Sequence, residues 1–240
     1  MCLAGLEFMP VFRLSSELVF PSPHLAIDEG LLAVGGDLSV QRLLLAYAKG
    51  VFPWYSKGEP ILWWSPDPRL VLYPDDLNIS RRLQRTLRQN RFQVTLDRAF
   101  DQVIQGCSSV PRDHQKGTWI TEEMITAYIA LHQAGFAHSV EVWRDGRLAG
   151  GIYGIALGGS FFGESMFHLV SDASNVALVT LVRYLTKWDF DLIDCQVTTD
   201  HLTRMGAREI PRNRFLQQLE ASLKKTTRQG KWGAVDNQKP

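Results

Sequence analysis

The chain has 240 residues, 45% of them hydrophobic and 10% aromatic, which is enough to bury the core of one large domain or of two unequal ones. Its 26 Lys and Arg against 25 Asp and Glu leave a formal net charge of +1, so any affinity for a polyanion must come from a local patch. The three cysteines, Cys2, Cys107 and Cys195, are far apart and show no metal-binding spacing, which argues against structural disulfides and a zinc site.

The N-terminal stretch indicates neither secretion nor membrane insertion. Residues 1–10 include Glu7 and lack a basic region ahead of a long apolar run, and no segment reaches the length of a membrane span without a charge. We therefore expect a cytoplasmic protein that does not contact a membrane.

The first third of the chain predicts a short helix followed by an aromatic loop. Ser39 is a cap residue for a helix of about Val40 to Lys49, and Gly50 ends it. Residues 51–69 combine three Trp with four Pro, which is too interrupted for a helix and too aromatic for an idle linker. We expect a rigid loop here, and within it the boundary between a small N-terminal domain, 1–66, and a larger domain, 67–240.

A basic helix follows the strand-like residues 70–73. Ser80 caps residues 81–88, in which Arg81, Arg85 and Arg88 recur at i, i+4 and i+7 and form one positive face. Such a face suits phosphate groups, although many charged helix faces are only solvated.

The remaining elements alternate in a recognisable order. We expect a strand at 92–96, a helix capped by Asp97 and running to Cys107, and a helix from Thr121 to Gly135. A hairpin turning at Asp145-Gly146 comes next, then a strand at 160–167, a helix at 174–188, a strand at 190–197 and a helix at 213–225. This order resembles an acetyltransferase-like (GNAT) domain, an α/β or α+β fold with a mixed, mainly antiparallel sheet.

One carboxylate interrupts the apolar, aromatic strand at 160–167. Glu164 in such a strand costs several kcal/mol unless it is paired or lines a cavity, so we expect it to face a pocket. Regular alternation places Phe162, Glu164 and Met166 on one face and residues 161, 163, 165 and 167 on the other. The alternative is an ion pair between Glu164 and an arginine of a neighbouring strand.

A second polar group lies in the next predicted strand, at 190–197. Asp194 and Gln196 are two residues apart in an apolar strand, so they share a face and can converge on one atom, while Cys195 points the other way. The alternative for Asp194 is that it caps a neighbouring helix. A thiol nucleophile made of Cys195 and His201 is disfavoured, because small thiols are commonly buried and no spacing ties this pair together.

Binding motifs narrow the class of ligand. Trp54 and Trp119, together with the arginine face, suit unpaired bases held by stacking and phosphates held by Arg, while burial in the core is the alternative for each Trp. No Walker or Rossmann glycine loop is present, and the turn that GNAT enzymes use for the coenzyme A pyrophosphate is missing after the 160–167 strand. An acyltransferase of this fold must therefore take its acyl group from another carrier.

Six runs together resemble the leucyl/phenylalanyl-tRNA–protein transferase family over nearly the whole chain. They are GLLAVGGDL at 30–38, GVFPWY at 50–55, WWSPDPR at 63–69, GTWI at 117–120, GESMF at 163–167 and IDCQV at 193–197. The resemblance implies transfer of Leu, Phe and less readily Met from aminoacyl-tRNA to the N-terminal Arg or Lys of a protein, which marks that protein for N-degron degradation. It implies no cofactor and no metal, and we expect a monomer.

The resemblance also implies roles for single residues. Trp54 and Trp119 would hold the 3′-terminal adenosine. Ile152, Phe161 and Met166 would line the pocket for the aminoacyl side chain, and the three arginines would contact the acceptor stem. Glu164 would orient an amino group, with Asp194 and Gln196 at the reacting centre. The competing interpretations are an acetyl-coenzyme A-dependent GNAT N-acetyltransferase and a non-catalytic tRNA-binding module.

The implied pocket conflicts with regular alternation, because Phe161 and Glu164 have opposite parity along the strand. We therefore predict a β-bulge near Phe162-Gly163, where glycine tolerates the required backbone.

Overall fold

The computed structural model describes residues 11–109 and 120–234. Its N-terminal part is a small four-stranded sheet with one helix. Its strands are β1 (Phe12–Leu14), β2 (Leu31–Gly35), β3 (Phe52–Pro53) and β4 (Leu62–Trp64), in the order β1-β2-β4-β3. The helix α1 (Val40–Ala48) begins where expected, with Ser39 Oγ accepting from the N–H of Arg42. The expectation of an unbroken loop at 51–69 is wrong, because this segment contributes β3 and β4.

The larger part is a seven-stranded sheet in the order β11-β5-β10-β9-β8-β7-β6. Within this sheet, only the pair β9 and β10 is parallel among the strand pairs that the described residues form, so the expected mixed, mainly antiparallel sheet is confirmed. The strands are β5 (Arg69–Leu72), β6 (Gln93–Leu96), β7 (Ala137–Arg144), β8 (Arg147–Leu157), β9 (Ser160–His168), β10 (Leu192–Gln196) and β11 (Arg208–Ile210).

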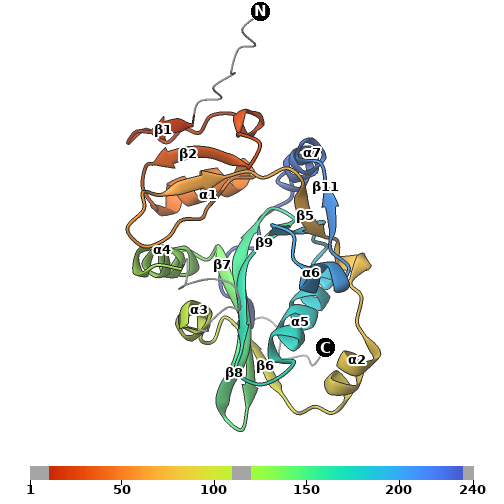
Figure 1. The fold of residues 1–240 in the computed structure, drawn as a ribbon. Helices are drawn as coiled ribbons and strands as arrows, with labels where there is room; N and C mark the ends of the chain where they lie inside the picture. Colours follow the sequence, from red (N-terminus) through yellow and green to blue (C-terminus); the bar gives the residue numbers. More distant parts are fainter. Residues whose placement is uncertain (1–10, 110–119, 235–240) are drawn as a thin grey trace, which may run out of the picture.

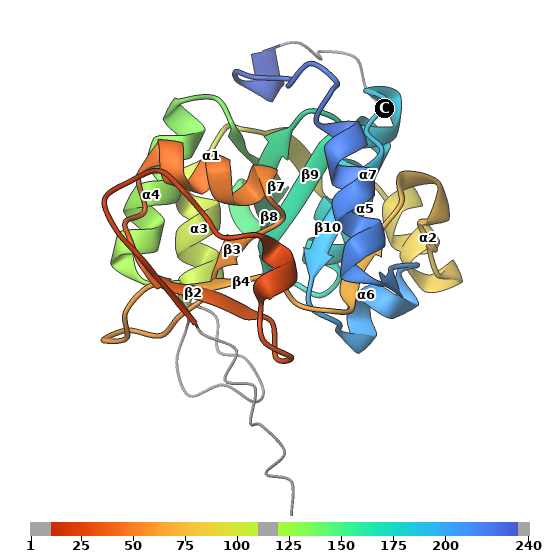
Figure 2. The same cartoon turned by 90° about the horizontal axis from the view of Figure 1, so that it is seen from above.

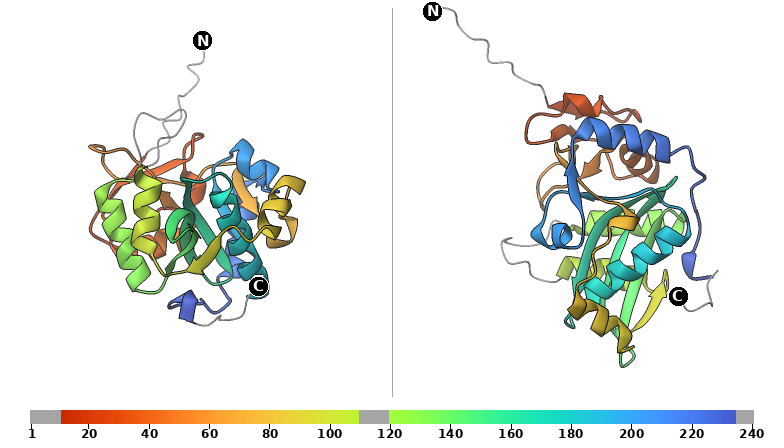
Figure 3. Two further views of the ribbon diagram at one scale, coloured as in Figure 1. Left: turned by 90° about the horizontal axis from the view of Figure 1, so that it is seen from below. Right: turned by 90° about the vertical axis from the view of Figure 1, so that its right-hand side faces the viewer.

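Helices cover both faces of this sheet (Figures 1 and 2). The helices α3 (Phe100–Ser109) and α4 (Glu122–Gln133) lie on one face, and α5 (Ala173–Lys187) lies on the other, as the left view of Figure 3 shows. The helix α2 (Arg81–Arg88) packs against α5, and α6 (Asp200–Arg204) follows the end of β10. The helix α7 (Arg212–Ser222) lies beside the N-terminal part. The short 3₁₀ turns are η1 (Pro23–Leu25), η2 (Pro74–Asp76) and η3 (Trp232–Ala234).

The two sheets share one apolar core. Buried residues of the N-terminal sheet, such as Leu32 and Trp63, belong to the same cluster as Phe162 of β9 and Phe215 of α7. The expected domain boundary at 66/67 falls between β4 and β5.

Local signals explain most element ends. Ser80 caps α2 and the turn at Asp145-Gly146 has positive φ at both residues, 51° and 73°, as a type I′ turn requires. The expected cap by Asp97 is wrong: its carboxylate accepts from the N–H groups of Ser139 and Trp232 and contacts the ring of His138. Glu141 accepts from the N–H of Arg98 ahead of α3 instead.

The segment after α7 crosses to the far edge of the large sheet and ends in a buried tryptophan. The right view of Figure 3 shows this segment descending from α7 toward β6. The indole of Trp232 is 1% exposed, stacks on His138 with 3.7 Å between ring centroids, and contacts Phe161 and Trp188.

The predicted bulge is present in β9. Gly154 of β8 lies opposite Gly163, and the preceding Tyr153 lies opposite Ser165, so Glu164 is the extra residue. Regular alternation along β9 is therefore wrong beyond Glu164. Phe162 and Phe167 pack in one core cluster, whereas Phe161 and Met166 pack in the other.

Candidate active site

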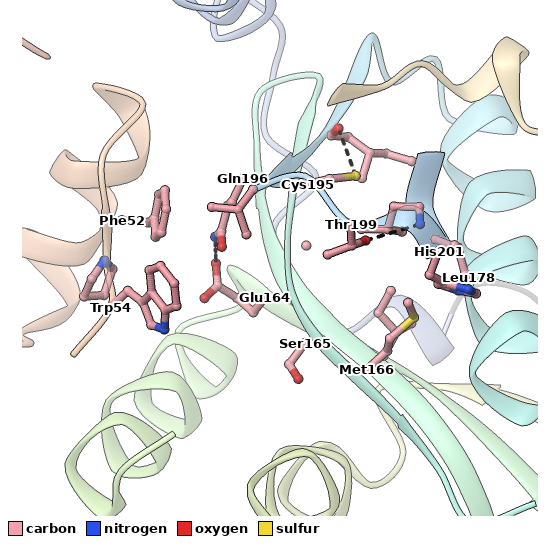
Figure 4. A pocket seen from close by; sticks show the side chains of 16 residues that line it. Phe52, Trp54, Glu164, Ser165, Met166, Leu178, Cys195, Gln196, Thr199 and His201 are labelled. Atoms are coloured by element: carbon pink, nitrogen blue, oxygen red, sulfur yellow. Dashed lines mark hydrogen bonds between the residues drawn. The ribbon is translucent and has the colours of Figure 1, made fainter. Parts of the chain in front are cut away.

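A cavity of about 500 Å³ opens where β9 and β10 separate. The two strands pair only from Ser160 and Leu192 to Phe162 and Asp194, and beyond these residues they diverge. Figure 4 shows Phe52 and Trp54 of the N-terminal part at one end, Glu164 and Gln196 in the middle, and Met166, Leu178 and His201 at the other end. The lining is mostly apolar, and few polar groups face it.

Glu164 is the buried carboxylate of this cavity, with 8% of its surface exposed. Its Oε1 accepts from Tyr47 Oη of α1 and from Gln196 Nε2, both at 2.8 Å, and its Oε2 is hydrogen-bonded to Tyr128 Oη of α4 at 2.9 Å. The two tyrosine hydroxyls also contact each other. The alternative of an ion pair between Glu164 and an arginine is wrong, because no ion pair formed by the described residues includes Glu164.

This environment shifts the ionisation of Glu164. Burial raises the pKa of its carboxyl to about 7, and the negative charge of Asp194 adds to the shift, while the hydrogen bond from Gln196 opposes it. Burial and the nearby Glu164 raise the pKa of Tyr47 and of Tyr128 well above the ordinary tyrosine value. Glu164 thus changes its charge near neutral pH, where acid–base groups are most useful.

Asp194 lies behind the cavity and not in its wall. The carboxylate and Arg69 of β5 form a fully buried pair with two hydrogen bonds, from Nε to Oδ1 at 2.8 Å and from Nη2 to Oδ2 at 2.6 Å. The guanidinium lies between the rings of Phe52 and Phe215, 4.8 and 4.6 Å from their centroids. Asp194 therefore neither caps a helix nor faces the cavity with an unpaired charge.

Gln196 is aimed at Glu164 by an unusual backbone. Its φ is 64°, in the left-handed region that non-glycine residues rarely adopt, and the register of β10 against β5 shifts between Asp194 and Gln196. The N–H of Gln196 donates to Asp194 Oδ1 at 2.9 Å, which holds this conformation. The expected shared face of Asp194 and Gln196 is therefore wrong, and the contact between them runs through the backbone.

Cys195 lines the cavity with Gln196, contrary to the expected opposite orientation, because the turn at Gln196 interrupts the alternation. Burial and the charge of Asp194 raise the pKa of this thiol far above its ordinary value, so it stays protonated. Its sulfur lies 3.8 Å from the carbonyl oxygen of Ile193. A protonated thiol is a poor nucleophile, which agrees with the interpretation that Cys195 is not the reactive group.

The other expected site residues are distributed unevenly. Trp54, Ile152 and Met166 line the cavity, whereas Phe161 is buried behind it against Trp232. Trp119 lies outside the described residues. Arg81, Arg85 and Arg88 are exposed on α2, away from the cavity.

Sequence patterns did not single out Tyr47, Tyr128 and Arg69 as site residues. Both tyrosines occupy the buried stripes of amphipathic helices, where an aromatic residue predicts only core packing. Arg69 ends the WWSPDPR run that carried the family resemblance, and its place in this run is the only signal that marked it.

Neither a metal cluster nor a membrane span emerges from the described ranges. Across residues 11–109 and 120–234, no three His, Cys, Asp or Glu side chains are grouped to hold a metal ion. In the same ranges, no helix is both long and apolar enough to cross a bilayer.

Comparison with known proteins identifies the family. Residues 71–220 match the model described as "Leucyl/phenylalanyl-tRNA protein transferase", and residues 36–67 match the model of its N-terminal domain. The chain belongs to this family. It is therefore an aminoacyltransferase, as the resemblance implied.

Curated members of the family match along almost their full length. The leucyl/phenylalanyl-tRNA–protein transferase of Desulforapulum autotrophicum is 58% identical over 93% of this chain and 98% of its own, and that of Myxococcus xanthus is 57% identical over 93% and 97%. Solved structures are similar at a lower level. A GCN5-related N-acetyltransferase from Kribbella flavida matches 70% of this chain and 59% of its own at 10% identity, with a TM-score of 0.37.

Proposed function

We propose that the protein transfers Leu, Phe and less readily Met from aminoacyl-tRNA to the N-terminal Arg or Lys of acceptor proteins in the cytoplasm, which marks them for N-degron degradation. The observation that carries this proposal is the cavity, a mostly apolar chamber of about 500 Å³ with a buried carboxylate and amide in its middle and the half-buried Trp54 at one end. Membership of the transferase family supports the same conclusion.

The apolar end of the cavity suits the side chain of the donor. Ile152, Met166 and Leu178 form its walls, and one methylene changes apolar binding by only about 1–3 kcal/mol. A flexible methionine in the wall adapts to side chains of different shape. Such a pocket accepts large unbranched or γ-branched side chains together, as donor choice among Leu, Phe and Met requires.

The opposite end suits the terminal adenosine. Trp54 lies beside the cavity with its ring 5.9 Å from that of Trp64, whose indole N–H donates to the carbonyl oxygen of Trp54. Stacking of a base on an aromatic ring contributes about 1–3 kcal/mol. We assign Trp54 to the adenine, and Trp119 stays a proposal from the family resemblance.

The chemistry needs little more than positioning. The aminoacyl ester is already activated, so the enzyme must bring a neutral α-amine, whose pKa is near 8, to the ester carbonyl and move one proton from the amine to the ribose oxygen. We assign Glu164 and Gln196 to contact and orient the amino groups. Asp194 acts through Arg69 and the backbone of Gln196, because it does not reach the cavity.

A single assay tests the proposal against both alternatives. The protein is incubated with labelled leucyl-tRNA, or with labelled acetyl-coenzyme A, and a peptide that begins with Arg. We expect transfer of leucine alone. Transfer of acetyl groups would support the acetyltransferase, and binding of tRNA without transfer would support the non-catalytic module.

Two controls make the result specific. The same peptide with a blocked α-amine has no nucleophile and must remain unlabelled. The variant Glu164→Gln keeps the shape of the side chain, so a large loss of transfer with retained tRNA binding would connect the activity to this cavity. Full activity of this variant would contradict the assignment of the site.

A further inference from the structure

The hydrogen bonds of Glu164 form a closed ring with two tyrosines. Tyr47 contacts Oε1 at 2.8 Å, Tyr128 contacts Oε2 at 2.9 Å, and the two hydroxyls contact each other. The three side chains come from α1, α4 and β9, so packing of three separate elements builds the ring. Each of its three oxygen–oxygen contacts requires one proton to be a hydrogen bond.

The proton inventory of the ring decides the charge of Glu164. The two tyrosine hydroxyls supply only two protons for the three contacts. If the carboxylate is ionised, one contact therefore has no proton, and two oxygen lone pairs face each other there. A third proton on Oε2 completes the ring, because Glu164 then donates to Tyr128, Tyr128 to Tyr47, and Tyr47 to Oε1. In this arrangement Oε1 accepts from Tyr47 and from Gln196, which uses both lone pairs of a carbonyl oxygen.

We propose that Tyr47 and Tyr128 are positioning residues that hold Glu164 as a neutral carboxylic acid in the empty active site. The proposal rests on the proposed function for its meaning to the substrate. Glu164 is the residue assigned there to contact an amino group, and its charge determines how that group binds.

The surrounding charges agree with a neutral Glu164. The anion that acts on Glu164 is Asp194 of β10, which is bound to Arg69 of β5 by two hydrogen bonds, and no ion pair of the described residues reaches Glu164. Tyr153 of β8 lies close to both ring tyrosines. Among the described residues, no cation is therefore paired with Glu164 in a way that would favour its carboxylate form.

The titratable groups of the cavity wall do not change this balance. Burial raises the pKa of the Cys195 thiol and lowers that of the His201 imidazole, so both are neutral near pH 7. Burial also raises the pKa of Glu164 itself to about 7 and keeps both ring tyrosines protonated.

A neutral Glu164 changes how an amino group binds. A carboxylate would hold the donor's α-ammonium as an ion pair, whereas a carboxylic acid and an amine share a single proton. Binding of an ammonium to the neutral acid therefore releases one proton to solvent, so binding of the donor becomes dependent on pH.

Infrared spectroscopy of the substrate-free protein tests the proposal. The carbonyl stretch of a protonated carboxylic acid is followed between about pH 5 and 9 in wild type and in Glu164→Gln, and the difference assigns the band to Glu164. We expect a band that persists to near neutral pH in the wild type. Its absence at about pH 6 would overturn the proposal.

Single tyrosine variants show whether the tyrosines keep Glu164 protonated or only donate hydrogen bonds to its carboxylate. The two cases shift the midpoint of the band in opposite directions. Tyr47→Phe and Tyr128→Phe each remove one hydroxyl and with it two of the three contacts. The remaining hydroxyl can then donate to an ionised carboxylate, so the midpoint of the band should fall by about one pH unit. A rise would mean that the tyrosines only donate to a carboxylate, which contradicts the proposal. The control is Tyr73→Phe, whose hydroxyl donates to Gln218 at 2.7 Å outside the cavity and whose loss should leave the midpoint unchanged.

These spectra are independent of the proposed function. They contain no tRNA and no peptide, so a failure of leucyl transfer leaves them unaffected. If one tyrosine variant fails to fold, the other variant and the wild-type titration still decide the outcome.

Discussion

Replacing Asp194 by Asn removes the only anion bound to the buried guanidinium of Arg69 among the described residues. Both side chains are fully buried, and an uncompensated buried charge costs about 3–5 kcal/mol. The cation–π contacts with Phe52 and Phe215 remain, but each contributes only about 0.5–2 kcal/mol and is already present in the wild type. We therefore expect Asp194→Asn to lower the free energy of unfolding by about 3–5 kcal/mol.

Denaturant unfolding measures this change, and a double variant supplies the control. Arg69→Met combined with Asp194→Asn removes both charges, and Met fills the slot between the two rings, so most of the lost stability should return. If Asp194→Asn is as stable as wild type, or if the double variant is less stable than either single one, the reasoning about the pair is wrong.

Transfer assays on the folded variants separate the charge of Asp194 from its hydrogen bond. Asn keeps an oxygen for the N–H of Gln196, whereas Ala does not, so Asp194→Asn should retain the rate of leucyl transfer within about tenfold and Asp194→Ala should lose about 10²-fold. Equal losses in both variants would mean that the charge itself acts on the reaction.

The other predictions concern the arginine face, the thiol and the carboxyl. Replacing Arg81, Arg85 and Arg88 by Ala should weaken binding of full-length tRNA and flatten its log–log salt dependence by up to about 0.9 per lost phosphate contact, while transfer from aminoacyl-adenosine survives. Equal loss with the short donor would make the face structural. Cys195→Ser should leave the transfer rate near wild type, and its abolition would restore the thiol mechanism. The folded state binds a proton at Glu164 more tightly than the unfolded state, because its pKa rises from 4.5 to about 7. Stability should therefore fall by up to about 3 kcal/mol between about pH 4.5 and 7, and thermal unfolding of Glu164→Gln should show a flatter pH dependence in this range.

The features that were predicted correctly depend on residues close to one another in the sequence. Ser39 and Ser80 cap the helices that follow them within three residues, and Asp145-Gly146 supplies the two positive φ angles of its turn. The carboxylate in an apolar strand predicted a cavity, since burial without one is too costly. The parity conflict between Phe161 and Glu164 predicted the bulge.

The features that sequence missed depend on partners far apart in the chain. Tyr47 and Glu164 are 117 residues apart, and Arg69 and Asp194 are 125 apart, so no local pattern connects them. The turn at Gln196 has no compositional signal, because glutamine rarely adopts a positive φ and does so here only with the carboxylate of Asp194 as acceptor. The predicted strand was regular and did not include this turn, and for this reason the predicted face of Cys195 was wrong.

The buried indole of Trp232 has a consequence for the order in which the enzyme matures on the ribosome. Trp232 is made after every strand and helix of the large sheet, yet it covers His138 of β7 and supports Phe161 behind the cavity. During synthesis these residues face water or a chaperone until the last turn of the described chain has left the exit tunnel. A nascent chain that already contains Glu164, Asp194 and Gln196 therefore still lacks a finished wall, so the ability to modify other proteins arises only after Trp232 has been added and has docked.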